Sequence, residues 1–332
     1  MSTARVVTFH ATGGPEVLQF ETRDVGEPGP SEIKIRVEAI GLNRAELAFR
    51  SGRYLERPKL PCRLGYEAAG IVMQVGSATR GVAKGDRVSV IPAFSMNDYG
   101  TYGEEILIPE FAVTACPPSL NSISAAALWM QYLTAYGALV DVGGLRPSEY
   151  VIIHAASSSV GLAAMQVATL IGAVPIAATR TGAKREALVA AGARHVVATQ
   201  EQDLVAEVRR FTGGVGARLV FDPVAGPYVE TLAKAMASGG ILILYGGLSA
   251  QQTPFPAGLA MSRALSFRGY TVFEITGNPS RLESAKAFIA AAVAAGTLSP
   301  IIDRTFPFDA IVEAHRYMES GAQTGKIVVT VP

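Results

Sequence analysis

The residues with the clearest chemical potential lie between Val151 and Ala173, in VIIHAASSSVGLAAMQVATLIGA. A β-branched apolar run meets a cluster of small residues, and helix-spaced apolar residues follow. This order is typical of a dinucleotide-binding unit, where the N–H groups and partial positive charge of a helix start hold a pyrophosphate. The G-x-G-x-x-G frame reads Ala156, Ser158 and Gly161. Only the third glycine, which lets the helix pack close to the strand, is kept.

Three serines occupy the turn itself. Ser157, Ser158 and Ser159 are small enough for a phosphate to approach, and their hydroxyls can donate to it. The backbone N–H groups of Ser159 and Val160 are expected to do most of the binding. The alternative is a serine-rich helix cap that binds no ligand.

The residues at the end of the next strand indicate whether the cofactor is NAD(H) or NADP(H). NAD-binding units carry an acidic residue about 20 positions beyond the last motif glycine. This chain has Thr179, Arg180 and Thr181 there, followed by Lys184, and that stretch holds no carboxylate. Arginine suits a 2′-phosphate through a bidentate, charge-assisted fork. We therefore predict NADPH, the alternative being that Arg180 and Lys184 are solvated surface charges.

The chain has two regions with different sequence patterns, and these patterns indicate which elements position these residues. Up to about Pro118 the chain has short β-like runs with Gly and Pro breaks, which predicts a mostly antiparallel β domain without a long helix. From about Ser122, strands and helices alternate, which predicts an α/β unit with a parallel sheet covered on both faces. The expected β runs of the first part are Glu32–Ile40, Glu67–Val75, Asp86–Ile91 and Thr101–Ile108.

The second part begins with helical spacing over Ile123–Val140. Gly192 and Gly239–Gly240 are expected to stop helices. The last run is expected to return to the first domain. The expected strands are Val151–His154, Val174–Thr179, His195–Ala198, Leu219–Phe221, Ile241–Tyr245, Ser266–Val272 and Lys326–Val331. The expected helices are Ala183–Ala191, Leu204–Phe211, Tyr228–Met236, Arg281–Ala295 and Phe308–Glu319.

Composition limits the classes of partner. The 332 residues carry a formal net charge of +1, which gives no electrostatic reason to expect nucleic acid or an anionic membrane. Cys62 and Cys116 are the only cysteines, which suggests a reducing compartment. The N-terminal MSTARVVTFH lacks a signal-peptide core, and no uninterrupted apolar run reaches about 18 residues. We expect a soluble cytoplasmic protein.

Eight segments, in order, resemble the zinc-free quinone oxidoreductases of the medium-chain dehydrogenase/reductase superfamily. The resemblance implies a GroES-like domain at residues 1–122 and 275–332 and a Rossmann domain, with a doubly wound parallel sheet, at 123–274. Besides the Val151 motif, the segments are GGPEVLQFE from Gly13, GLNRAELAFRSGRY from Gly41, LGYEAAGIVMQVG from Leu64, KGDRV from Lys84, YGTYGEEILIP from Tyr99, LTAYGAL from Leu133 and TGKIVVTV from Thr324.

The resemblance also bears on metal binding. Zinc-dependent relatives carry a cysteine shortly after the Gly41-like position and a histidine in a Gly-His-Glu motif. This chain has Asn43-Arg44 and Gly65-Tyr66-Glu67 there, and its four histidines are scattered. Three protein ligands are usual for catalytic zinc, so we expect no metal site. Glu67 is expected to be structural, bonded to arginine or backbone.

Further cofactor contacts are implied by the resemblance alone. Thr134 should lie near the nicotinamide, and Lys326 should reach the cofactor. The segment after the fifth strand and the one near residue 273 should line its pocket. Ordinary packing is the alternative for each. The tyrosine that the family has after the third strand is replaced by Thr199. The further residues implied are Tyr245, Gly246, Leu248 and Phe273.

Without a Lewis acid, reduction of an already electrophilic acceptor is favoured over alcohol oxidation. Hydride transfer to a quinone or an α,β-unsaturated carbonyl places negative charge on oxygen, which requires hydrogen-bond donors. By resemblance, Asn43 orients the nicotinamide ribose or the substrate. Tyr54 matches a proton donor of enoyl thioester reductases, or else only shapes the pocket.

We therefore expect an NADPH-dependent reductase of small quinones or enones that forms a homodimer through the edge of the Rossmann sheet. One alternative is an enoyl thioester reductase. An alternative of another class is a structural or regulatory protein that binds NADPH without turnover. Oxidation of NADPH across a panel of quinones and short enones would separate these possibilities.

Overall fold

The computed structural model describes residues 3–332, and it divides into two compact units. The first comprises residues up to Met130 together with Ser299–Pro332, and the second is Gln131–Leu298. The boundaries expected from the sequence, after residues 122 and 274, differ from these. Helix α2 (Ser122–Ala125) packs on strands of the first unit, and helix α10 (Pro279–Ala294) packs on its neighbour α9 (Phe273–Thr276) in the second.

The first unit is built on strands and short helices. Its strands are β1 (Thr3–Phe9), β2 (Gln19–Asp24), β3 (Glu32–Gly41), β4 (Cys62–Arg63), β5 (Glu67–Val75), β6 (Arg87–Val90), β7 (Glu105–Pro109), β8 (Val113–Ala115), β15 (Ile302–Pro307) and β16 (Lys326–Thr330). Its helices are α1 (Arg44–Arg50), α2 and α11 (Ile311–Ser320), with 3-10 turns η1 (Pro15–Val17), η2 (Glu110–Ala112) and η5 (Phe308–Ala310).

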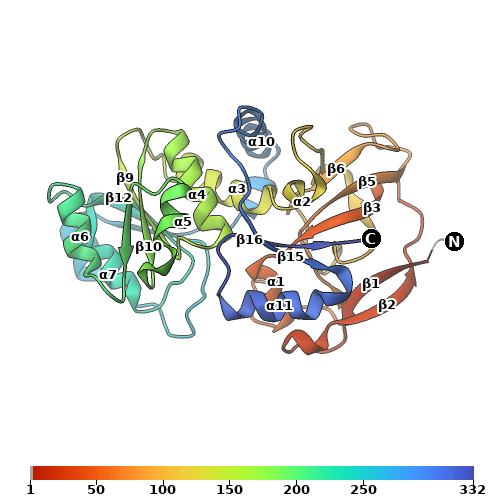
Figure 1. The fold of residues 1–332 in the computed structure, drawn as a ribbon, viewed down its shortest axis with the longest axis horizontal. Helices are drawn as coiled ribbons and strands as arrows, with labels where there is room; N and C mark the ends of the chain where they lie inside the picture. Colours follow the sequence, from red (N-terminus) through yellow and green to blue (C-terminus); the bar gives the residue numbers. More distant parts are fainter. Residues whose placement is uncertain (1–2) are drawn as a thin grey trace. The chain divides into compact units, whose positions relative to one another are not determined.

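These strands form two sheets (Figure 1). One has the order β2-β1-β4, and the other runs β15-β16-β3-β5-β6-β8 with β7 paired to β3. The β15–β16 pair is parallel and the remaining pairs are antiparallel, as expected for a GroES-like domain. Strand β16 pairs with β3, which confirms the predicted return of the tail.

One local expectation in the first unit needs correction. Strand β7 starts at Glu105 instead of Thr101, and Gly103 forms only an isolated bridge with Val6. Helix α1 is a short element in the β region, where the sequence predicted no long helix. Its seven residues are too few to show a helical period. Its start is nevertheless marked, because the Glu46 carboxylate accepts the Asn43 N–H at 2.8 Å, half of a capping box.

The second unit has six parallel strands in the order β11-β10-β9-β12-β13-β14. Numbered along the chain this is 3-2-1-4-5-6, the order of a Rossmann sheet. Its strands are β9 (Tyr150–His154), β10 (Val174–Thr179), β11 (His195–Ala198), β12 (Ala217–Asp222), β13 (Met236–Leu244) and β14 (Ser266–Gly269). Its helical segments are α3 (Trp129–Tyr136), η3 (Gly137–Val142), α4 (Ser159–Leu170), η4 (Gly182–Lys184), α5 (Arg185–Ala190), α6 (Leu204–Phe211), α7 (Tyr228–Lys234), α8 (Ala257–Arg263), α9 and α10.

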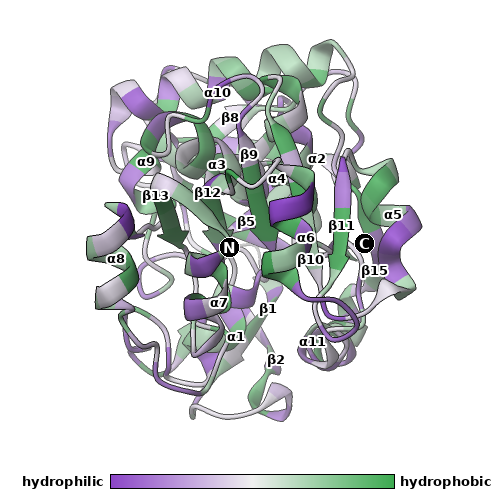
Figure 2. Cartoon of the chain, turned by 90° about the vertical axis from the view of Figure 1, so that its left-hand side faces the viewer, coloured by the Kyte–Doolittle hydropathy of each residue, from purple (hydrophilic) through white to green (hydrophobic). Residues whose placement is uncertain are grey.

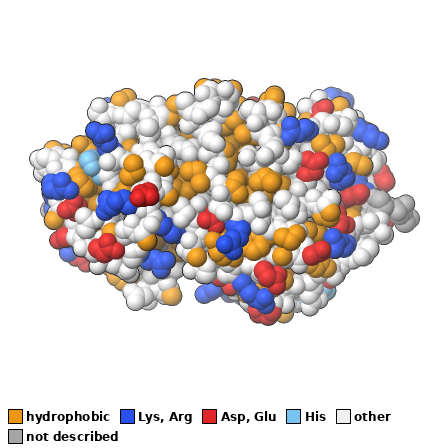
Figure 3. Space-filling model, viewed as in Figure 1, with side chains coloured by type: hydrophobic (Ala, Val, Ile, Leu, Met, Phe, Trp, Pro, Cys, Tyr) orange, Lys and Arg blue, Asp and Glu red, His pale blue; other side chains and the backbone are white. Residues whose placement is uncertain are grey.

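The sheet of the second unit is apolar, as a sheet covered on both faces requires. Figure 2 shows β12 and β13 in the colour of hydrophobic residues. Ile152, Val220 and Leu242 are completely buried in its core. The face of the molecule in Figure 3 carries basic and acidic side chains interspersed, in keeping with the small net charge.

One expectation in the second part of the chain is also corrected. Gly239 and Gly240 lie inside β13, because α7 already ends at Lys234. The helical run expected over Ile123–Val140 is present, and it consists of α2, α3 and a π-helical turn, η3. The Tyr270 hydroxyl donates to the Leu133 carbonyl at 3.3 Å, and such insertions are a known cause of local widening of a helix.

Taken together, Ser122–Val142 is long and apolar enough to cross a membrane by length and composition. Of its most apolar window, 78% is buried inside the protein. Burial to this extent is typical of a core helix.

Candidate functional site

A tight turn joins β9 to α4 in the second unit. Ala155 adopts a left-handed backbone (φ 49°), and the Ser158 hydroxyl caps α4 by accepting the Gly161 N–H at 3.1 Å. A Cβ on Gly161 would lie 2.5 Å from the Ala156 carbonyl oxygen. The third motif position is therefore glycine because the helix starts against the preceding backbone.

The turn leaves hydrogen-bond donors for a ligand. Within residues 3–332, the backbone N–H groups of Ser159 and Val160 have no acceptor. They open a twelve-residue helix, whose dipole adds partial positive charge at this end. The helix-cap alternative thus accounts for the Ser158 hydroxyl but leaves these N–H groups unpaired. The turn fits the pyrophosphate of a dinucleotide.

The tip of β10 lies beside this turn. The Lys184 ammonium is 3.5 Å from the Ser157 hydroxyl. Arg180 is exposed, and its guanidinium has no partner in the described part of the chain. Thr179 is buried, and its carbonyl accepts the Thr199 N–H at 2.7 Å and the Thr199 hydroxyl at 3.1 Å.

A carboxylate that the sequence analysis missed reaches the same tip. Glu201 follows β11, the neighbour of β10, and accepts the Gly182 N–H at 3.0 Å. Counting along the chain from Gly161 covers only the end of β10. The adjacency of β10 and β11 is the signal that could have found Glu201, because parallel strands end at the same edge of a sheet.

A second missed cluster lies at the carboxyl ends of β9 and β12. The His154 Nδ1 and Asp222 Oδ1 atoms are 2.8 Å apart, and His154 stacks on Tyr228 with ring centroids 5.2 Å apart. Asp222 is completely buried and also accepts the N–H groups of Val224 and Ala225. The carboxylate therefore fixes the proton of His154 on Nδ1.

The other residues implied for the cofactor occupy the same unit. Tyr245 stacks on Phe221 with centroids 3.9 Å apart, and burial followed by the Asp222 charge raises its pKa. A Cβ on Gly246 would meet the Pro223 carbonyl oxygen at 2.7 Å. Leu248 is exposed, Phe273 is half-buried and Thr134 is buried.

In the first unit, the side-chain amide of Asn43 is hydrogen-bonded to other groups of the protein. Its Oδ1 accepts from the Lys326 ammonium at 2.6 Å. Because an ammonium can only donate, this contact identifies the oxygen of the amide. Its Nδ2 lies 3.1 Å from the Gly41 carbonyl and 3.2 Å from carboxylate oxygens of Glu46 and Glu67. The two amide hydrogens thus have three protein acceptors, and Asn43 is 8% exposed.

Glu46 continues this network into the core. It is completely buried, and besides Asn43 it accepts the Tyr102 hydroxyl at 2.7 Å and the Tyr66 N–H at 3.2 Å. Burial raises its pKa, and the hydrogen bonds from Tyr102 and Asn43 oppose that shift. The carboxylate is the centre of a fixed polar cluster behind the start of α1.

His315 connects Tyr102 to Arg50. Its Nδ1 is 2.7 Å from the Arg50 guanidinium and its Nε2 is 2.9 Å from the Tyr102 hydroxyl. Arginine keeps its proton, so Nδ1 accepts, Nε2–H donates to Tyr102, and the Tyr102 hydroxyl donates to Glu46. Burial, followed by the Arg50 charge, lowers the pKa of His315 to about 3. At its outer end, Arg50 donates to Glu319.

Glu67 and Lys326 form a buried ion pair. Their side chains are 1% and 0% exposed, and Glu67 also accepts the Met130 N–H at 2.7 Å. Glu67 is therefore structural as expected, but its charged partner is a lysine instead of an arginine. Lys326 contacts Asn43, so two predicted cofactor residues do lie together.

These residues do not fit a zinc ion. At the positions where zinc-dependent relatives hold their ligands, the chain has Asn43-Arg44 and, in place of the histidine, Tyr66. The neighbouring Glu67 carboxylate already carries the Lys326 ammonium. That ammonium would repel a dication. Across residues 3–332, no group of three or more His, Cys, Asp or Glu residues could hold a metal.

Tyr54 lies near the same cluster. Its ring packs edge-on against Phe49 and tilted against Tyr66, with centroids 6.4 Å away in both cases. Burial raises the pKa of Tyr54 to about 12, against a partial lowering by the Tyr66 hydroxyl. The phenol therefore stays protonated at physiological pH and is available as a hydrogen-bond donor.

Comparison with known proteins identifies the class. Residues 29–157 match the alcohol dehydrogenase GroES-like domain, and residues 191–329 match the zinc-binding dehydrogenase family. Quinone oxidoreductase 1 of Escherichia coli (strain K12) is 31% identical over 327 residues, which cover 96% of this chain and 97% of that one.

Solved structures agree over the full length. An Escherichia coli quinone oxidoreductase complexed with NADPH has a TM-score of 0.90 at 30% identity, covering 98% of this chain and 99% of the other. An NAD-dependent alcohol dehydrogenase has a TM-score of 0.89 at 32% identity, covering 99% and 100%. The chain belongs to the quinone oxidoreductase-like members of the medium-chain dehydrogenase/reductase superfamily. It is an oxidoreductase with a nicotinamide cofactor.

Proposed function

We propose that this protein reduces quinones and α,β-unsaturated carbonyl compounds with NADPH and without zinc. The observation that carries the proposal is the tip of β10. There the unpartnered Arg180 guanidinium and the Lys184 ammonium adjoin a turn whose N–H groups at Ser159 and Val160 are unpaired. A fork of donors beside a pyrophosphate turn suits a 2′-phosphate.

Glu201 is the group that opposes this choice. A carboxylate at the tip of β10 could accept from a ribose 2′-hydroxyl, as in NAD-binding units, and would repel a 2′-phosphate. Its Oε1 is engaged by the Gly182 N–H. We propose that the positive charge of Arg180 and Lys184 outweighs it.

The cofactor test compares kcat/KM for NADPH and NADH in matched variants. Arg180→Gln should lower kcat/KM for NADPH roughly 10- to 100-fold, the value of a lost charged hydrogen bond, and leave NADH unchanged. Glu201→Gln should shift the preference further towards NADPH. Arg210→Gln is the control, since Arg210 pairs with Glu207 on the exposed face of α6. An unchanged preference in Arg180→Gln would refute the assignment.

The chain's own groups define the chemistry of the acceptor. A bound nicotinamide supplies the hydride. Negative charge then develops on the acceptor oxygen, and Tyr54 is a protonated donor suited to that oxygen. The buried Lys326–Glu67 pair occupies the region where zinc would act as a Lewis acid in relatives. A tightly held zinc found by metal analysis of the purified protein would contradict the zinc-free assignment.

Tyr54→Phe tests the role of the phenol. With enones, kcat should fall about tenfold or more, because the developing enolate loses its proton donor. With quinones the loss should be smaller, because a hydroquinone anion can take its proton from water. Wild-type kcat with both acceptors would mean that Tyr54 only shapes the pocket. No NADPH oxidation by any quinone or enone would favour a binding protein without turnover.

We also propose a homodimer through the Rossmann sheet. The outer edge of β14 is unpaired within residues 3–332, and the nearby Phe255 and Met261 are 66% and 80% exposed. An unpaired edge flanked by apolar side chains suits a second copy of the chain. Light scattering should give twice the chain mass, and Phe255→Asp with Met261→Asp should give monomers. A monomeric wild type would refute this interface.

A further inference from the structure

A cavity of about 200 Å³ lies against the three-stranded sheet of the first unit. Its volume is that of roughly six or seven liquid waters. It is lined by Val6, Arg23, Asp24, Val25 and Arg63.

The strand register places both arginines on one side of this sheet. On the central strand β1, Ala4 is opposite Arg23 of β2, and Thr8 is opposite Arg63 of β4. Opposed residues of antiparallel strands point to the same face, and residues two apart share a face. Arg23 and Arg63 therefore extend from the two outer strands over the face that carries Val6.

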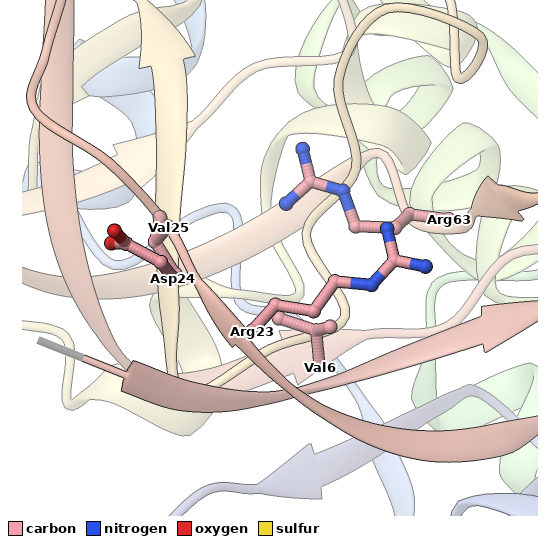
Figure 4. A pocket seen from close by; sticks show the side chains of 5 residues that line it. All are labelled: Val6, Arg23, Asp24, Val25 and Arg63. Atoms are coloured by element: carbon pink, nitrogen blue, oxygen red, sulfur yellow. The ribbon is translucent and has the colours of Figure 1, made fainter.

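Two guanidinium groups, of Arg23 and Arg63, and one carboxylate, of Asp24, line the cavity. Figure 4 shows the guanidinium groups of Arg23 and Arg63 beside each other, with the Asp24 carboxylate directed away from them. Asp24 accepts the Gly26 N–H at 2.9 Å. Arg23 is paired with Glu21 at 2.5 Å, whereas the Arg63 guanidinium has no acceptor in residues 3–332.

An unpaired guanidinium held beside a second one is destabilising. Burial, and after it the charge of Arg23, lowers the pKa of Arg63. Arginine nevertheless stays charged in proteins, so the repulsion is not removed by deprotonation. An anion with several acceptor oxygens would offset both the desolvation and the repulsion.

We propose that this cavity is a binding site for a phosphate group, held between the guanidinium groups of Arg63 and Arg23. A tetrahedral dianion presents oxygens to two guanidinium forks at once. Val6 and Val25 form an apolar wall beside the phosphate position. The cavity leaves room for a small organic group attached to the phosphate. The site lies wholly in the first unit and is independent of the proposed reductase activity.

The test is calorimetric titration of inorganic phosphate into the full chain, with chloride at equal ionic strength as the reference. Wild type should bind saturably, and Arg63→Gln should weaken binding at least about tenfold. Arg36→Gln is the matched control in the same unit, because Arg36 pairs with Glu38 on β3. Arg180→Gln separates this site from the phosphate turn and should leave the Arg63-dependent binding intact.

Thermal unfolding gives a second readout. Without phosphate, Arg63→Gln should have a Tm equal to or above that of wild type, because it loses an unpaired like charge. With phosphate, wild type should gain more Tm than Arg63→Gln. Arg63→Lys, which keeps the charge but not the fork, should bind with intermediate affinity. No saturable binding beyond the chloride reference, or equal binding by Arg63→Gln, would overturn the proposal.

Discussion

The polar clusters of the two units differ in how many of their hydrogen-bonding groups have a partner within the protein. In the first unit, Asn43, Glu46, Glu67 and Lys326 use one another as hydrogen-bond partners and are buried. In the second, the N–H groups at the start of α4 and the Arg180 guanidinium have no protein partner in residues 3–332. The residues that the family resemblance implies for the cofactor thus include both groups already hydrogen-bonded to protein and groups with unused hydrogen-bonding capacity. Unused hydrogen-bonding capacity distinguishes the two.

The largest expected effect tests the scaffold side of this comparison. Lys326→Met should lower the free energy of unfolding by about 3–5 kcal/mol, because it leaves the buried Glu67 carboxylate without its counter-ion. Adding Glu67→Gln should restore much of the loss. The measurement is chemical denaturation.

Lys34→Met is the matched control for that experiment. Lys34 pairs with Glu105 at 3.0 Å, and Glu105 is 20% exposed, so the residual charge can reach water and the loss should be smaller. If Lys326→Met keeps wild-type stability but loses NADPH affinity, Lys326 is a cofactor ligand and the contrast between the units fails.

The next effect concerns pH. The pKa of His315 is lowered from 6.5 to about 3 in the folded state, so only the unfolded chain gains this proton as pH falls below 6.5. The folded state should lose about 2 kcal/mol of stability between pH 6.5 and 5 from this group. His315→Asn should remove this contribution to the fall in the free energy of unfolding with decreasing pH. If the free energy of unfolding depends on pH equally in wild type and His315→Asn, His315 is not held neutral in the folded state.

The smallest effect tests the ligand side. Ser158→Ala should cost about 1 kcal/mol, the value of a helix cap, and change NADPH affinity little, because the backbone N–H groups bind the phosphates. Asp203→Ala removes the cap of α6 and is the control. A large loss of NADPH affinity in Ser158→Ala alone would assign the hydroxyl to the ligand.

Local sequence patterns located most of the second unit. Strands β10 and β11 and helix α6 begin and end where expected, since buried parallel strands and amphipathic helices have distinct periods. The helix end predicted at Gly239–Gly240 was wrong, because a glycine pair is as compatible with an irregular strand as with a helix end.

The polar clusters could not be predicted in the same way. His315 lies 265 residues from Arg50 and 213 from Tyr102 along the chain, and no local period reports such contacts. Glu201 reaches the tip of β10 only through the pairing of β10 with β11. The cavity at Arg63 likewise depends on how three separate strands pair. Sequence indicated which residues could do chemistry, whereas the fold decided which of them had partners.

The discontinuity of the first unit has a consequence during synthesis. Lys326 follows Glu67 by 259 residues, and the whole second unit is translated between them. At about 5–20 residues per second, the ribosome delivers the lysine roughly 13–50 s after the glutamate. Throughout that interval the nascent first unit has neither its counter-charge nor strand β16 against β3. The Rossmann unit can therefore fold first, and the GroES-like unit that precedes it on the chain can close only afterwards.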